Sequence, residues 1–230
     1  MTHYLALGNA VHLTLEKMFG SGPRFYPVWN VDEAIKFCLT EFNRMIEEDE
    51  IFVSYPQLKK AQADAAEMVA RYYAQISRGE ITSTPFGVET EFKLPIGNIE
   101  IVGKIDKIDK VAEGLIVIDY KTGAKKPDPW FFHRNLQFTA YYWACKELFG
   151  EYPIKVGWHH LRTGDVIYET RTEWDVDQLK RTIENVVKMS EQDIRFRSYQ
   201  EAVCHWCSYS GFGHECDDQK LEAEILAKRA

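Results

Sequence analysis

Two aspartates and a lysine, Asp106, Asp119 and Lys121, have the types and the spacing to hold a divalent cation and to act on water beside it. They lie in the stretch GKIDKIDKVAEGLIVIDYKTG, where Asp119 directly follows an apolar run. Carboxylates that share a site repel each other unless a cation offsets their charge, and Mg²⁺ prefers oxygen ligands. Such an ion stabilises a phosphoryl oxygen and lowers the pKa of a bound water, and a neighbouring lysine positions that water. This is the chemistry of phosphodiester hydrolysis.

A β-hairpin must position these groups. Residues 99–110 and 115–121 have the composition of strands, and Ala-Glu-Gly at 112–114 supplies a turn between them. The register that this turn sets places Asp106 directly opposite Asp119, and cross-strand partners share one face of a sheet. A slip of one residue would move Asp119 to the other face.

The same register has further consequences. It sets Lys104 opposite Lys121, and it points Asp109 to the other face, as a surface or structural acid. The alternative interpretation is a surface cluster of salt bridges on a two-stranded ribbon, because an Asp-x-Lys pattern is short.

The strand before the hairpin carries two more acids. A turn at 95–98 would pair residue 94 with residue 99 and put Glu89 and Glu91 on the same face as the aspartates. We expect an outer or structural role for both glutamates rather than direct contact with the cation.

The rest of the chain is predicted to surround these strands with helices. Hydrophobic periodicity and turn residues predict helices over 4–19, 31–48, 57–77, 130–149 and 176–192, and further strands over 88–94, 154–161 and 166–172. This order of elements is typical of an α/β or α+β core with a helical N-terminal lobe.

Composition limits the class of protein. The chain has 230 residues and a formal net charge of −7, which argues against a protein that coats nucleic acid by bulk charge. We find no apolar run of the length that a transmembrane helix needs and no secretory signal at the N-terminus, so no membrane association and a cytoplasmic location are expected.

Three of the five cysteines form a cluster near the C-terminus. Cys204, Cys207 and Cys216 have the spacing Cys-x2-Cys-x8-Cys, and two thiolates two residues apart are typical of a metal clip. His214 would complete a zinc set, while a chance cluster of small buried residues is the alternative. Cys38 and Cys145 stand singly in predicted helices and are interpreted as buried apolar residues, with Cys38 a remote candidate for a fourth ligand.

Four motifs, in order along the chain, resemble those of the PD-(D/E)XK nuclease superfamily, in its RecB-like exonuclease branch. Gly-Asn-Ala-Val-His at 8–12 resembles G-x-x-x-H, and Gly-Lys-Ile-Asp at 103–106 resembles G-x-x-D. Ile-Asp-Tyr-Lys-Thr-Gly at 118–123 resembles the D-x-K strand, and Gln-Phe-Thr-Ala-Tyr at 137–141 resembles Q-x-x-x-Y. Each motif is weak alone, but the ordered set is specific.

The resemblance implies a restriction-endonuclease-like core, with a mixed central sheet flanked by helices. It implies a single nuclease domain over 1–230, made of a helical lobe at 1–80, a catalytic sheet core at 81–195 and a cysteine clip with a terminal helix at 196–230. In the iron–sulfur members of the branch a fourth cysteine precedes the G-x-x-x-H helix. No cysteine precedes Gly8 here, so a [4Fe-4S] cluster and Zn²⁺ both stay open for the clip.

The resemblance also implies roles for individual residues. His12, Asp106, Asp119 and the main-chain carbonyl of Tyr120 would hold Mg²⁺ or Mn²⁺, and Lys121 would position or activate water. Two residues on a later helix, Gln137 and Tyr141, would complete the catalytic set, and Lys125, Lys126 and Arg134 would bind DNA phosphates or remain solvated surface charges. Glu16, one turn beyond His12, would orient the lobe or touch the site.

The function implied is a metal-dependent DNA nuclease, most simply an exonuclease that leaves a 5′-phosphate and a 3′-hydroxyl. The alternatives are a non-catalytic DNA-binding or assembly subunit with the same fold, and a zinc-stabilised protein-interaction module. The first alternative conflicts with the presence of both aspartates and the lysine, and the second leaves the hairpin unexplained. DNA is the expected partner, and a setting in repair, phage recombination or CRISPR adaptation, with its protein partners, stays open.

Overall fold

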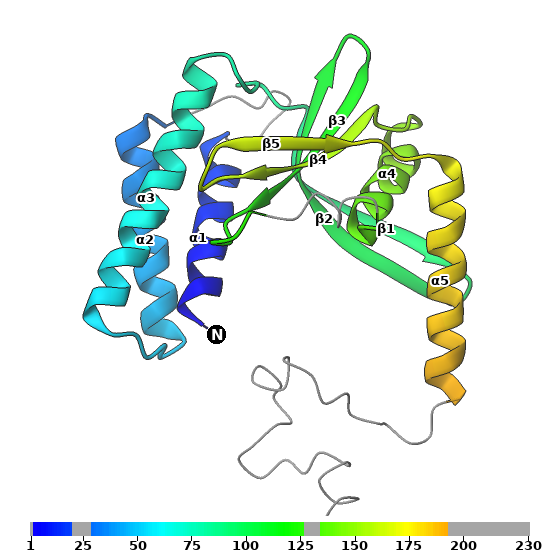
Figure 1. Cartoon of the computed structure of the whole chain (residues 1–230), viewed down its shortest axis with the longest axis horizontal. Coiled ribbons are helices and arrows are strands. Elements are labelled where there is room, and N and C mark those ends of the chain that lie inside the picture. The colour runs from blue at the N-terminus through cyan, green and yellow to red at the C-terminus, as the bar shows by residue number, and fades with distance from the viewer. Residues whose placement is uncertain (1, 20–28, 127–133, 193–230) are drawn as a thin grey trace, which may run out of the picture. The chain divides into compact units, whose positions relative to one another are not determined.

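The computed structural model describes residues 2–19, 29–126 and 134–192. Its helices are α1 (His3–Met18), α2 (Val31–Glu48), α3 (Tyr55–Ser77), α4 (Leu136–Phe149) and α5 (Glu173–Gln192). Its strands are β1 (Gly87–Ile96), β2 (Ile99–Val111), β3 (Gly114–Lys121), β4 (Lys155–His160) and β5 (Asp165–Glu169) (Figure 1). Residues 1–181 form one compact unit, and the described part of the second unit, 182–230, is the remainder of α5.

The five strands form one mixed sheet in the order β1-β2-β3-β4-β5. Neighbouring strands are antiparallel except β3 and β4, which are parallel and are joined through α4. A parallel pair requires such a crossover, because the chain must return to the start of the sheet. The predicted α/β class, with a mixed sheet flanked by helices, is confirmed.

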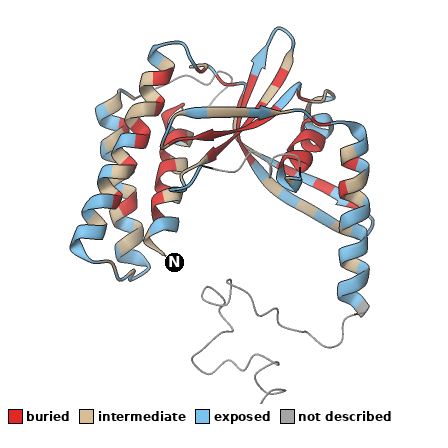
Figure 2. Cartoon of the chain, viewed as in Figure 1, coloured by how far each residue is buried: buried red, intermediate tan, exposed pale blue. Residues whose placement is uncertain are grey.

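Helices cover the two faces of this sheet. The main apolar cluster joins α1, α2 and α3 to Ile118 and Tyr120 of β3. On the other face, α4 packs the ring of Phe138 against Trp158 of β4, with ring centroids 5.3 Å apart. Figure 2 shows buried residues along the inner sides of these helices and along β3 and β4. The two strands that end nearest the predicted site are therefore held rigidly from both sides.

The predicted elements are all present. Most of their ends differ from the predicted ones by no more than three residues, as at the start of α5 and the end of β5, and two further differences change the predicted geometry. The helix expected from residue 130 begins only at Leu136, because Asn135 is its N-cap and accepts the N–H of Phe138 at 3.1 Å. The β1–β2 turn is also tighter than expected, since Ile96 rather than residue 94 pairs with Ile99. Gly97, with φ 57°, supplies the left-handed backbone that a two-residue turn needs.

Pro95 explains the second difference. It was assigned to the turn, but it lies within β1 opposite Glu100. Because β1 is an edge strand, a residue without an N–H is tolerated there. The error of two residues preserves which side chains share a face. Within the described residues, no helix is both long and apolar enough to span a bilayer.

Candidate active site

The candidate site lies at the point where the pairing between β2 and β3 ends. The antiparallel ladder between them runs from Val111↔Gly114 to Lys107↔Ile118, which is the predicted register, and then ends. Strand β3 continues to pair with β4 as far as Lys121, so its other edge is open. The carboxylate of Asp106 occupies that edge, where its Oδ2 accepts the backbone N–H of Tyr120 at 2.7 Å. A side chain thus replaces a ladder hydrogen bond.

One cleft of about 700 Å³ collects most of the acidic, histidine and helix α4 residues that the sequence singled out. Its lining includes His12, Glu16, Glu89, Lys104, Asp106, Asp119, Tyr120, Lys121, Gln137 and Tyr141. These come from α1, β1, β2, β3 and α4. Asp106 and Asp119 therefore face the same space, as the predicted hairpin geometry requires.

Asp119 is the most deeply buried acid of the cleft. Its residue surface is 3% exposed, and its Oδ1 accepts the hydroxyl of Tyr141 at 3.0 Å. Its Oδ2 lies 2.5 Å from Lys121 Nζ, but the angles do not make a hydrogen bond, so this buried oxygen has none. Burial raises the pKa of Asp119, the charge of Asp106 raises it further, and Lys121 opposes both. A second cation beside Oδ2 would complete its coordination.

Gln137 and Tyr141 link the acid to the lysine. They are one turn apart on α4, and Gln137 Nε2 donates to the Tyr141 hydroxyl at 2.7 Å. The Oε1 of Gln137 accepts from Lys121 Nζ at 3.5 Å, the long end of the hydrogen-bond range. Together with the Tyr141–Asp119 bond, these contacts fix Asp119 and Lys121 relative to each other from outside the sheet.

His12 approaches from α1. Its Nδ1 lies 3.5 Å from Asp106 Oδ1. Burial alone would lower the pKa of His12, but the nearby carboxylates, Asp106 above all, outweigh it and raise the pKa. The helix comes close because Gly8 has no side chain: a Cβ there would lie 3.1 Å from Thr122 Oγ1, just beyond the end of β3. This close approach supports the predicted packing role of the glycine.

Glu89 contributes more to the cleft than the sequence suggested. Ligand atoms of His12, Glu89 and Asp106 lie within 4.8 Å of one another. Glu91, which was predicted to act with Glu89, is outside the cleft, and its side chain is 80% exposed. In the observed β1–β2 register, Glu89 lies directly opposite Asp106. A correct register would therefore have distinguished Glu89 from Glu91 at the level of the sequence.

Three basic residues proposed to bind phosphates are exposed and do not line the cleft. Lys126 forms an ion pair with Asp165 at 2.9 Å, and Lys125 lies next to it in the chain. The helix predicted over 130–149 would include Arg134, but this residue precedes α4 and so does not share a helix with Gln137. The N-cap at Asn135 is the reason, because it starts the helix after the arginine.

Asp109 is a buried structural acid and not a surface one. It pairs with Lys107 at 3.2 Å, and the lysine side chain is only 1% exposed. Lys107 also donates to the carbonyl of Thr82 at 3.3 Å. Burial raises the pKa of Asp109 and lowers that of Lys107, while the pairing opposes both shifts. Neither residue of the pair lines the cleft.

The cysteine cluster, Cys204, Cys207, Cys216 and His214, lies outside the described residues. Cys38 and Cys145 are free, buried thiols, as predicted. Burial raises the pKa of Cys38 to about 11 and that of Cys145 to about 12, which disfavours the thiolate that binds metals. Cys38 therefore fits the apolar core better than a fourth ligand position.

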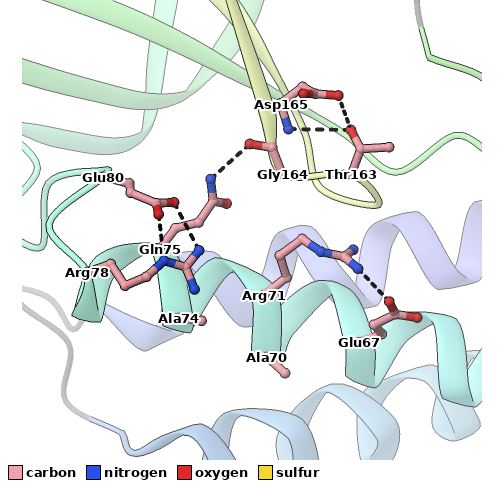
Figure 3. Close-up of a pocket in the computed structure, with 10 residues that line it drawn as sticks. All are labelled: Glu67, Ala70, Arg71, Ala74, Gln75, Arg78, Glu80, Thr163, Gly164 and Asp165. Atoms are coloured by element: carbon pink, nitrogen blue, oxygen red, sulfur yellow. Dashed lines mark hydrogen bonds and ion pairs between the residues drawn. The ribbon is translucent and has the colours of Figure 1, made fainter.

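A second cavity, of about 520 Å³, lies between α3 and the turn that joins β4 to β5 (Figure 3). Its two arginines are paired with glutamates, Arg71 with Glu67 and Arg78 with Glu80. Gln75 donates to the Gly164 carbonyl at 2.8 Å across it. None of the predicted site residues lines this cavity, and its contacts join the helix to the sheet.

The donor set of the first cleft fits a divalent cation. It offers an imidazole nitrogen from His12 and carboxylate oxygens from Glu89, Asp106 and Asp119, the ligands that Mg²⁺ and Mn²⁺ take in proteins. Asp119 Oδ2 is buried and lacks a hydrogen bond, and the Lys121 ammonium at 2.5 Å offsets its charge. Lys121 stands beside the same oxygen, as the D-x-K pattern predicts.

The sequence was compared with protein families, curated proteins and solved structures. Residues 2–212 match the PD-(D/E)XK nuclease superfamily. A solved structure titled "Crystal structure of SSO0001" is similar at 16% sequence identity, covers 90% of this chain and 92% of that chain, and gives a TM-score of 0.39. A search of curated proteins gives no match. Because the family match spans almost the whole sequence, this chain belongs to the PD-(D/E)XK nuclease superfamily.

Proposed function

We propose that the protein is a deoxyribonuclease of the RecB-like branch that depends on Mg²⁺ or Mn²⁺ and digests DNA from an end. The observation that carries the proposal is the convergence of Asp106, Asp119 and Lys121 on one cleft. All three charged groups of the family motif are present. A non-catalytic subunit of this fold would have no need to keep the full set.

The acids and the imidazole would hold the ion. Asp106 and Asp119 offer oxygens, His12 offers a ring nitrogen, and the main-chain carbonyl of Tyr120 is the fourth proposed ligand. When bound, a divalent ion neutralises charge that develops on the phosphate and makes a bound water easier to deprotonate. Asp106 is already oriented for this role, because its Oδ2 is fixed by the N–H of Tyr120.

Lys121 would position the attacking water and balance charge as the bond to phosphorus forms. Gln137 and Tyr141 keep the groups in place, the first through Lys121 and the second through Asp119. In-line attack at phosphorus would leave a 5′-phosphate and a 3′-hydroxyl. Lys104, the other lysine that lines the cleft, would bind a neighbouring phosphate.

The test is cleavage of end-labelled linear DNA with Mn²⁺, with Mg²⁺ and with EDTA, beside Asp119→Asn and Lys121→Met. We expect ion-dependent cleavage by the parent and a loss of at least about a thousandfold in both variants, because each removes a group used in the transition state. Glu91→Gln, an exposed acid outside the cleft, should retain full activity. Cleavage that both cleft variants retain would remove the proposed site.

The same assay separates the remaining alternatives. A covalently closed circle that resists digestion while its linear form is degraded would establish an exonuclease. Single-stranded and RNA substrates in parallel would define the substrate class. DNA binding without cleavage in any metal would instead support the non-catalytic subunit.

The proposed cysteine clip has its own test. We propose that Cys204, Cys207 and Cys216 hold a structural metal, either a [4Fe-4S] cluster or, with His214, Zn²⁺. Iron and zinc measured per chain, with a visible absorption spectrum, distinguish these two. A folded protein that contains neither metal would eliminate the clip and leave the proposed nuclease site unaffected.

A further inference from the structure

Glu89 occupies an unusual position in the sheet. Its neighbours Val88 and Thr90 pair with Lys107 and Ile105, so Glu89 falls opposite Asp106, where the ladder between β1 and β2 is interrupted. Its φ is 45°, in the left-handed region that residues with a Cβ rarely adopt. The consequence is that Glu89, on an edge strand, lines the cleft with Asp106.

The carboxylate has the surroundings of a ligand. Its oxygen, the oxygen of Asp106 and the ring nitrogen of His12 lie within 4.8 Å of one another, close enough to reach one ion after small adjustments. The Glu89 side chain is only 18% exposed. Asp119 is outside this close group, although its buried Oδ2, without a hydrogen bond, faces the same cleft.

The positively charged neighbour of Glu89 in the structure is Lys104. Lys104 Nζ lies 3.5 Å from Glu89 and 4.0 Å from the exposed Glu91, and it also lines the cleft. The ammonium and a divalent ion would therefore compete for one carboxylate. Removing the lysine would also leave the mutual repulsion of Glu89 and Asp106 unbalanced, which favours capture of a cation.

We propose that Glu89 is a direct ligand of a divalent ion held together with His12 and Asp106, and that Lys104 competes with the ion for the Glu89 carboxylate. The inference rests on the divalent-ion site of the proposed function and extends it by one ligand and one competing cation. It predicts that removing the Glu89 carboxylate weakens binding of the ion and that removing the Lys104 ammonium tightens it. A glutamate with only a structural role would not produce this pair of opposite effects.

The experiment is titration of the full chain with Mn²⁺ in the absence of DNA, with free ion followed by electron paramagnetic resonance. We expect Glu89→Gln to weaken binding at least tenfold and Glu91→Gln, its matched control two residues along the strand, to stay within twofold of the parent. Lys104→Met should tighten binding severalfold. In the double variant Glu89→Gln with Lys104→Met, the lysine substitution should no longer change the affinity, because the Glu89 carboxylate for which the lysine and the ion compete is absent.

Parent-like affinity in Glu89→Gln would overturn the proposal, as would a Lys104→Met variant that binds no more tightly than the parent. Circular dichroism and thermal unfolding must be parent-like in each variant. Should Glu89→Gln fail to fold, Glu89→Asp provides the readout: a carboxylate one methylene shorter should weaken binding, and unchanged binding would again overturn the proposal. A parent that binds Mn²⁺ in the predicted pattern but leaves DNA intact would contradict only the nuclease function. Cleavage together with Glu89-independent binding would contradict only the Glu89 assignment.

Discussion

The carboxylate of Asp106 accepts the backbone N–H of Tyr120 at 2.7 Å, across the point where β2 and β3 stop pairing. The bond gives Asp106 two roles. It satisfies a buried donor that the ladder no longer serves, and it directs the second carboxylate oxygen toward His12. Fold stability and the proposed cation binding would therefore depend on the same side chain, and two substitutions separate them.

Asp106→Asn and Asp106→Ala should differ in stability but not in metal binding. Both remove the charge, so both should abolish Mn²⁺ binding at this position. Only alanine leaves the Tyr120 N–H without an acceptor, and it should cost about 1–3 kcal/mol more in the free energy of unfolding. Urea denaturation and a Mn²⁺ titration of each variant measure the two effects. Equal stability of the two variants would show that the backbone bond contributes nothing.

Tyr141→Phe should slow cleavage while the protein still folds. The substitution removes the hydroxyl that Asp119 accepts but keeps the ring, whose centroid lies 5.9 Å from that of Phe92. Loss of one hydrogen bond to a charged group corresponds to about 1.5–3 kcal/mol, so a decrease of about tenfold to a hundredfold in kcat is expected. Tyr142→Phe, whose ring stacks on Tyr152 instead, is the control. Equal rates for both variants would deny Tyr141 a role in catalysis.

The hairpin that carries the aspartates could be predicted because its determinants are local. The Ala-Glu-Gly turn fixes the register, and the period of two along a strand then decides which side chains share a face. The observed pairing of Lys107 with Ile118 follows directly from that turn. The predicted β1–β2 register was wrong by two residues, but a shift of two leaves each side chain on the same face of the sheet, so the faces of β1 were predicted correctly.

The remaining features depend on contacts between distant segments or on atoms that a pattern does not specify. The start of α4 is set by the Asn135 side chain, and a hydrophobic period does not encode this. The place of Glu89 in the cleft depends on a left-handed backbone and on the approach of α1. The burial of Asp109 is accompanied by an ion pair with Lys107, whose side chain is also buried, and the strand pattern does not encode this.

Gly103→Ala should disturb the site through its neighbours. A Cβ at this position would lie 2.6 Å from Phe92 Cζ and 2.9 Å from Cε1, so the ring must move. Phe92 packs edge-on against Tyr141, which holds Asp119. Overpacking of this kind costs about 1–3 kcal/mol, and we expect lower activity as well. The double variant with Phe92→Leu should recover stability and part of the activity, and a failure to recover either would show that the ring is not the cause.

His159 should make the fold sensitive to acid. Its ring is 1% exposed, its Nε2 contacts Gln75 Oε1 at 2.8 Å, and burial lowers its pKa to about 4. The unfolded chain therefore takes up a proton near pH 6.5 that the folded chain refuses until about pH 4. Stability from this residue is complete above pH 6.5 and is lost as the pH falls toward 4, by about 2 kcal/mol between pH 7 and pH 5. Urea unfolding at both pH values should show this loss in the parent and a smaller one in His159→Gln. An equal loss in the two proteins would mean that another group controls the acid sensitivity.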